Sequence, residues 1–371
     1  MRRLLLFVAV LVVASPARGG TACEAPLPHG VAGLADTIYI KGSCGTLALR
    51  PDGMIEPVRP PNWAPPWANG ALARADARTY IAHPQRHLAL LRAGRTLWRS
   101  SLAHGSDDVA LDGDAIAFTT YRRKHPNPDL WLARVGAPER LVARQEDLDG
   151  AARAGGFFTQ HGSDLRLRSA DGKLVRHLAL VSSVAYDRRT QTLVAVTRSH
   201  LLVRTDGERI GVLADLKSAR QPWLELVSGG LIEITAGNRI LLLHPDGSRF
   251  ASSSLSRDAR FVSDFVGLAH AVVYVTQRGG FDRILLLERG RHVPRVLYAA
   301  RVGSTGCGYW ANLSTAGDHL LYWPSTGRGI VAIDVAGRSR PRNLWPLVHR
   351  IPGFRHHGRI FRAAWASSWN S

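Results

Sequence analysis

The residues of this 371-residue sequence that are best suited to chemistry are arginines and tryptophans in the connections between short apolar runs. A planar guanidinium group binds a carboxylate or phosphate through paired hydrogen bonds, and an indole ring stacks on sugars and on cations. The sequence therefore predicts a surface that binds an anionic ligand. The residues assigned to this ligand-binding surface are Trp63, Trp67, Arg122, Arg123, Lys124, Arg239, Arg278, Arg283, Trp310 and Arg328.

Residue patterns typical of catalysis are weak. His83 and His87 have the spacing of a metal-binding pair on a helix, but Pro84 follows His83 in a connection between strands. The segment 303–308 is rich in glycine, yet it lacks the Lys-Ser/Thr pair of a phosphate-binding loop. The Gly-x-Ser-x-Gly motif of a serine nucleophile is absent from the sequence. We therefore expect no catalytic residue, no cofactor and no bound metal.

The charge balance agrees with an anionic ligand. The chain has 48 lysine and arginine residues against 29 acidic ones, which gives a formal net charge of +19. A GC-rich genome would explain why arginine replaces lysine, but it does not explain the shortage of carboxylates. A basic excess favours contact with an anionic partner, or solubility beside a negatively charged cell surface. Nucleic acid is electrostatically compatible with this charge, but it is not the expected partner of an exported chain.

The first residues have the pattern of an export signal. The basic start Met1–Arg3 precedes the apolar run Leu4–Ala14, which is too short to span a bilayer, and small residues follow. Cleavage after Ala17 or after Ala22 fits this pattern, so residues 1–22 are assigned to a signal peptide. Cleavage after Ala22 would expose Cys23 for lipid anchoring, although the leucine of a lipoprotein site is missing. We expect a periplasmic or extracellular protein with no transmembrane segment after processing.

A repeated hairpin pattern must position the binding residues. The segment 164–178 has two alternating apolar and polar runs around a short loop with a glycine, which is typical of a β-hairpin. The same pattern recurs with a mean spacing of (337 − 53)/7, or about 41 residues. The glycines that mark the eight loops are Gly53, Gly94, Gly136, Gly172, Gly207, Gly247, Gly290 and Gly337.

Each repeat contains four short runs with strand character, and the second run is the most apolar, as in 116–118 and 272–275. Continuous apolar runs are typical of strands covered on both faces. Four strands per repeat predict an all-β fold, a β-propeller of four-stranded antiparallel blades. Eight blades follow from the direct count, and seven if the first hairpin completes the last blade. We assign residues 23–345 to the propeller and 346–371 to a C-terminal tail, in which 359–365 could add a ring-closing strand to the first blade.

The segments 130–142 and 165–178 resemble the outer hairpin of exported bacterial β-propellers of the TolB-like and WD-repeat-like kind. The resemblance covers most of the chain after the signal peptide and implies the propeller architecture. It transfers no functional residue, because propellers share one fold across unrelated activities.

Propeller geometry gathers the predicted binding residues on one face. Connections from the second to the third strand, and from one repeat to the next, leave on the same face, which also receives Arg260 and Arg301. We expect this face to bind an anionic envelope polymer or a protein partner without catalysis, in a protein that is a monomer.

The alternative function is that of an enzyme, a hydrolase or lyase acting on an acidic saccharide or small molecule at the mouth of the central channel. Such an enzyme would hold a carboxylate or histidine with a perturbed pKa beside two or more arginines. The acids predicted on the basic face are Asp129, Asp164 and Asp282. If they lie far apart, the enzyme hypothesis loses its best acids.

Three cysteines, an odd number in an exported chain, predict one disulfide and one remaining thiol. Cys44 lies in the first repeat and Cys307 precedes the last, and these repeats are neighbours in a closed ring. A disulfide between Cys44 and Cys307 is therefore predicted. The alternatives are a local bridge between Cys23 and Cys44, and three reduced thiols.

Overall fold

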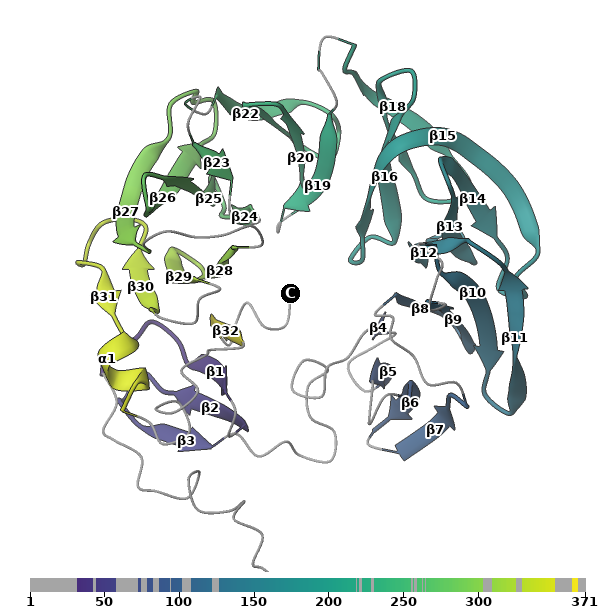
Figure 1. Ribbon diagram of the computed structural model, residues 1–371, viewed down its shortest axis with the longest axis horizontal. Coiled ribbons are helices and arrows are strands. Elements are labelled where there is room, and N and C mark those ends of the chain that lie inside the picture. Colours follow the sequence, from purple (N-terminus) through teal and green to yellow (C-terminus); the bar gives the residue numbers. More distant parts are fainter. Residues whose placement is uncertain are drawn as a thin grey trace, which may run out of the picture.

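The computed structural model is almost entirely β-structure, and its sheets follow one another around a ring (Figure 1). The strands β4, β8, β12, β19, β28 and β32 lie nearest the centre of the ring (Figure 1). The described residues contain one helix, α1 (Trp345–Val348). No helix in this part of the chain is long and apolar enough to cross a membrane. The structure describes residues 32–42, 45–57, 73–74, 79–82, 87–93, 95–101, 108–121, 127–217, 219, 222–227, 230–254, 256, 259–261, 263, 265–302, 309–324, 329–350 and 362–365.

Seven sheets of antiparallel strands make up this part of the chain. The first has the order β3-β2-β1-β32 and contains β1 (Ile38–Gly42), β2 (Gly45–Leu49), β3 (Ile55–Pro57) and β32 (Arg362–Trp365). The second contains β4 (Ala73–Arg74), β5 (Thr79–Ala82), β6 (Ala89–Arg92) and β7 (Arg95–Arg99). The third contains β8 (Val109–Asp112), β9 (Ala115–Thr120), β10 (Asp129–Arg134) and β11 (Ala137–Ala143).

The fourth sheet has seven strands because β15 runs without a break from one hairpin repeat into the next. Its first half pairs with β14 and its second half with β16. The described residues thus form seven sheets where eight repeats were predicted, and the number of blades stays a prediction. The strands are β12 (Asp147–Ala151), β13 (Phe157–His161), β14 (Asp164–Arg168), β15 (Leu174–Asp187), β16 (Thr192–Thr197), β17 (Leu201–Thr205) and β18 (Ile210–Asp215).

Three further sheets complete the ring. The fifth contains β19 (Trp223–Val227), β20 (Leu231–Ala236), β21 (Arg239–Leu243) and β22 (Arg249–Ser254). The sixth contains β23 (Arg260–Phe261), β24 (Val266–Gly267), β25 (Ala271–Arg278), β26 (Phe281–Glu288) and β27 (Arg295–Arg301). The seventh contains β28 (Ala311–Ala316), β29 (His319–Pro324), β30 (Val331–Asp334) and β31 (Arg342–Asn343).

The core lies between successive sheets. Seven of the eight residues of β25 are buried, as are five of the six residues of β9, so these apolar strands are covered on both faces. In one cluster, Val273 of the sixth sheet packs with Tyr322 and Ile333 of the seventh. Packing of this kind between neighbouring sheets buries the faces that a single repeat would leave exposed.

The first and last sheets also pack against each other. Ile38 and Ile40 of β1 share a core cluster with Leu321 of β29 and with Trp365. Trp365 lies opposite Ile38 in the antiparallel pair of β32 and β1, and its backbone N–H donates to Ser314 Oγ at 3.1 Å. Strands from both ends of the described chain therefore share one sheet, while the predicted division into propeller and tail stays a prediction.

Seven of the predicted turn glycines have the positive φ that favours glycine; the eighth, Gly94, lies outside the described residues. Gly247 combines a φ of +87° with close packing, because a Cβ added there would come within 2.4 Å of the Leu213 carbonyl oxygen. Both the backbone conformation and the lack of space for a Cβ atom therefore require glycine at this position.

Candidate ligand-binding surface

Four of the ten predicted binding residues fall in the described part of the chain. Arg239, Arg278 and Arg283 are exposed, and Trp310 is 39% exposed. The structure places Arg278 and Arg283 on one hairpin, whereas Arg239 begins β21 of the preceding sheet. The other predictions concern residues outside the described part of the chain: Trp63, Trp67, Arg122, Arg123, Lys124, Arg328, Cys44, Cys307 and the signal peptide.

The hairpin of β25 and β26 brings basic and aromatic side chains to one end of the sixth sheet. Arg278 pairs with Phe281 across the turn, and Phe281 in turn lies opposite Arg301 of β27. Arg283 follows Phe281 by two residues, so both side chains leave the same face of β26. The three arginines are exposed and Phe281 is 44% exposed. We call this group, together with Arg260 of β23, the arginine end.

A buried carboxylate lies directly beneath the arginine end. Asp282 is fully buried, because strand alternation turns it inward between two exposed neighbours. Its Oδ2 atom accepts hydrogen bonds from the hydroxyl groups of Tyr322, at 2.7 Å, and Tyr309. Burial, together with the negative charge of Asp282, raises the pKa of both tyrosines, so both remain protonated donors.

The same carboxylate is linked to Arg260 through one amide side chain. Gln277 Nε2 donates to Asp282 Oδ1 at 3.1 Å, and Gln277 Oε1 accepts from Arg260 Nη2 at 2.6 Å and Nε at 3.2 Å. These bonds orient the Arg260 guanidinium group at the surface. The sequence predicted Asp282 as one of the few acids on the basic face and did not point to Gln277 or Phe281. The alternation of Phe281, Asp282 and Arg283 along the strand is the signal that could have identified the inward position.

The three acids of the enzyme hypothesis lie apart, each with its own partners. Asp129 of β10 is buried and accepts from the Gln145 backbone N–H at 3.2 Å. Asp164 of β14 contacts Arg166 and His177, and Asp282 lies in the sixth sheet. These carboxylates are in three different sheets, and none of the three residues is exposed. These three acids therefore give the enzyme alternative no support, and it stays a prediction.

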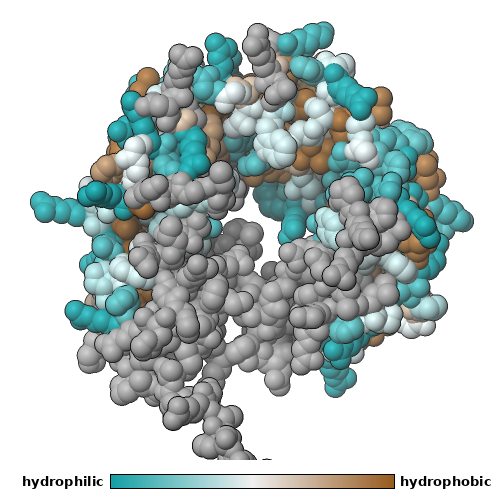
Figure 2. Space-filling view, in the orientation of Figure 1, coloured by the Kyte–Doolittle hydropathy of each residue, from teal (hydrophilic) through white to brown (hydrophobic). Residues whose placement is uncertain are grey.

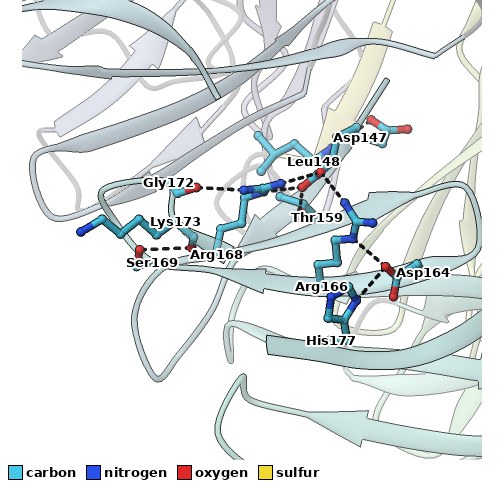
Figure 3. A network of polar contacts seen from close by, with 11 residues as sticks. Asp147, Leu148, Thr159, Asp164, Arg166, Arg168, Ser169, Gly172, Lys173 and His177 are labelled. Atoms are coloured by element: carbon cyan, nitrogen blue, oxygen red, sulfur yellow. Dashed lines mark hydrogen bonds and ion pairs between the residues drawn. The ribbon is translucent and has the colours of Figure 1, made fainter. Parts of the chain in front are cut away.

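A second polar network, around Glu146, is structural (Figure 3). The buried Glu146 carboxylate accepts from Thr159 Oγ1 at 2.6 Å, from Arg166 Nη1 at 3.0 Å and from Arg168 Nη2 at 2.7 Å. Burial would raise the pKa of Glu146, but the hydrogen bonds from Arg168 and Thr159 and the arginine charges outweigh it and lower the pKa. Both guanidinium groups are thus engaged within the fourth sheet, and neither belongs to the ligand-binding surface.

Comparison with known proteins supports the fold. No protein-family model and no curated protein matches the sequence. The apo structure of AztD from Citrobacter koseri matches with a TM-score of 0.53 and 13% identity, over 88% of this chain and 97% of that chain. A second AztD structure from that organism also has a TM-score of 0.53 and 13% identity, over 88% of this chain and 96% of that chain. BamB from Moraxella catarrhalis has a TM-score of 0.44 and 13% identity, over 85% of this chain and 95% of that chain. The match to AztD and the antiparallel sheets around the ring show a β-propeller repeat protein.

Proposed function

We propose that this β-propeller is an exported binding module whose arginine end holds an anionic polymer of the cell envelope. The observation that supports it is the exposed Phe281, with Arg278 and Arg301 at adjacent register positions and Arg283 on the same strand face. Guanidinium groups pair with carboxylate, sulfate or phosphate, and an exposed ring adds an apolar contact to a sugar. An acidic protein partner is the other occupant that such a surface would accept.

Rigidity is the second reason for choosing this end of the sixth sheet. The buried Asp282 with its tyrosine donors fixes the start of β26, and Gln277 fixes Arg260. A surface that is already organised loses less conformational entropy when it binds. Asp282 adds no negative charge to the exposed surface of the arginine end, because its carboxylate faces inward and accepts hydrogen bonds from the two tyrosines.

The proposal includes eight blades and export. If the seven-stranded sheet is divided at β15, the seven sheets become eight units of the predicted kind. Export rests on the pattern of residues 1–22. Fractionation of the source cells, with N-terminal sequencing of the product, tests export and distinguishes cleavage after Ala17 from cleavage after Ala22.

The binding test compares the two ends of the same strand. Retention of the protein on immobilised polygalacturonate is measured against neutral dextran, at low and at high salt. The Arg278→Gln/Arg283→Gln variant should lose roughly tenfold or more in affinity, because charged hydrogen bonds are lost. Arg289→Gln/Arg291→Gln, with the same change of charge in the exposed turn at the opposite end of β26, is the matched control.

Two results would contradict the proposal. Equal loss in both double variants would mean that only net charge matters, and salt-insensitive retention would exclude an electrostatic surface. Retention of acidic proteins, but not of acidic polysaccharides, would replace the polymer by a protein partner at the same residues.

A further inference from the structure

An exposed indole ring stands at the start of β19, one of the strands nearest the centre of the ring (Figure 1). The space-filling view shows an opening at this centre (Figure 2). Trp223, the first residue of β19, is 60% exposed, although tryptophan side chains are usually buried for the most part. Its Nε1–H group donates to Glu225 Oε1 at 3.0 Å, from the same face of the strand. This bond orients the indole and leaves much of the ring in solvent.

The Trp223 side chain lies on the face of the fifth sheet that is turned toward the sixth. Trp223 is opposite Thr235 of β20, and Thr235 is opposite Ile240 of β21. Residues at opposite register positions point to the same face of a sheet. Ile240 belongs to a core cluster with Tyr274 of the sixth sheet. The indole therefore faces the sheet that carries the arginine end.

Arg260 has the equivalent position in the sixth sheet. It lies opposite Gln277, one residue before the end of β25, just as Trp223 lies opposite Thr235, one residue before the end of β20. Equivalent positions of successive repeats are neighbours at the same end of a propeller. The Arg260 guanidinium group is held by Gln277 Oε1 at 2.6 Å from Nη2. An oriented indole and an oriented guanidinium group thus occupy matching places on adjacent sheets.

A second indole continues this row onto the seventh sheet. Trp310 directly precedes β28 and is 39% exposed, whereas Tyr309 before it is buried. The Tyr309 hydroxyl donates to the Asp282 carboxylate, which also accepts from the Gln277 side chain that holds Arg260. A chain of hydrogen bonds therefore joins Arg260 to the residue beside Trp310. Three successive sheets present an indole, a guanidinium group and an indole, in that order.

Negative charge beside Trp223 restricts what can stack on it. The Glu225 carboxylate is hydrogen-bonded to the indole, and Glu225 lies opposite Glu233 of β20, so two acidic side chains leave this face of the fifth sheet. Their charge disfavours a phosphate or carboxylate group over the Trp223 ring. An uncharged ring with hydroxyl groups fits, because its C–H groups contact the indole face and a hydroxyl donates to Glu225. The anionic group of the same ligand would pair with Arg260.

We propose that Trp223, Arg260 and Trp310 bind an acidic saccharide, with sugar rings on the two indoles and a uronate carboxylate on the guanidinium group between them. This inference rests on the proposed binding function and narrows its anionic polymer to a polysaccharide. A polyphosphate offers no ring to the indoles, and it would meet the charge of Glu225.

Isothermal titration calorimetry of the full protein with trigalacturonate and with tripolyphosphate tests this proposal. Trp223→Ala/Trp310→Ala should lower the affinity for trigalacturonate at least about tenfold and that for tripolyphosphate less than about twofold. Trp223→Phe keeps an aromatic ring and should retain more affinity for trigalacturonate than Trp223→Ala. The control Tyr121→Ala removes an exposed aromatic side chain beside the third sheet and should bind both ligands as the unmodified protein does. Circular dichroism confirms that each variant is folded.

Failure of this inference is distinguishable from failure of the proposed function. Unchanged affinity for trigalacturonate in Trp223→Ala/Trp310→Ala, or an equal loss of both ligands, would overturn the saccharide site. Binding of tripolyphosphate without binding of trigalacturonate would overturn it too, while leaving an anionic ligand at the arginine end. Full affinity of Arg278→Gln/Arg283→Gln for both ligands would exclude the arginine end, and a selective loss of trigalacturonate in the tryptophan variant would still support the saccharide.

Discussion

The Tyr322 hydroxyl donates a hydrogen bond to the buried Asp282 carboxylate at 2.7 Å, which ties β29 of the seventh sheet to β26 of the sixth. Tyr309 donates to the same oxygen from the connection between these sheets. A buried carboxylate with several donors is stable only while the donors are present.

Removal of this carboxylate should destabilise the fold. Asp282→Ala leaves two tyrosine hydroxyls and the Gln277 amide without their acceptor, and we expect a loss of about 3 kcal/mol in the free energy of unfolding. Tyr322→Phe removes one donor and should cost about 1 kcal/mol. Urea denaturation measures both values. If the two variants are equally stable, the carboxylate does not organise this interface.

Stability should fall as the pH rises toward neutrality because of Asp149. Burial, with the charges of Asp147 and Asp108, raises its pKa from 3.8 to about 7. Between these values the folded protein keeps a proton that the unfolded chain has lost, so each pH unit removes up to about 1.4 kcal/mol. The stabilisation by the Asp149 proton is fully present below pH 3.8 and is lost once the pH passes about 7. Asp149→Asn should flatten the slope when denaturant midpoints are compared across this range, and an unchanged slope would contradict the assignment.

Two turn glycines should respond differently to the same substitution. Gly290 has a φ of +74° and no atom within 4 Å of an added Cβ, whereas Gly247 has a φ of +87° and the Leu213 carbonyl oxygen at 2.4 Å. Gly290→Ala should cost about 1 kcal/mol, from backbone conformation alone. Gly247→Ala should cost roughly 2–4 kcal/mol, because the backbone must also move. Thermal unfolding of both variants measures the two losses, and equal losses would contradict the close approach of Leu213 to Gly247.

The predicted bridge between Cys44 and Cys307 should stabilise the folded chain. Non-reducing peptide mapping by mass spectrometry would identify the linked pair and leave Cys23 as the free thiol. Because the bridge would close a long loop, Cys44→Ala/Cys307→Ala should cost about 2–4 kcal/mol. A Cys23–Cys44 peptide would establish the local alternative, and three alkylated thiols would exclude any bridge.

The propeller fold was predictable from local signals. Alternating runs around glycines with positive φ mark the hairpins, and continuous apolar runs mark strands such as β25. The continuity of β15 was not predictable, because the sequence between His177 and Ser183 does not distinguish a sharp break from a gentle curve. Two of the repeats counted in the sequence therefore share one sheet in the described residues.

The candidate site was predictable only in part. Arg278 and Arg283 were found from residue type and position in a connection. The inward direction of Asp282 follows from alternation along β26, but its tyrosine partners come from 27 and 40 residues away and depend on packing between sheets. The side of the fifth sheet on which Trp223 lies is a matter of packing against the sixth, which no local residue pattern specifies.

The pairing of β32 with β1 has a consequence for biosynthesis. Residues 38–42 leave the ribosome before their partner strand, 362–365, because all the intervening sheets are made first. The first sheet thus lacks its innermost strand until these intervening sheets have been made, and the Trp365 side chain cannot fill the core beside Ile38 before that point. Closure of the first sheet is therefore delayed relative to the sheets that lie between β1 and β32 in the chain.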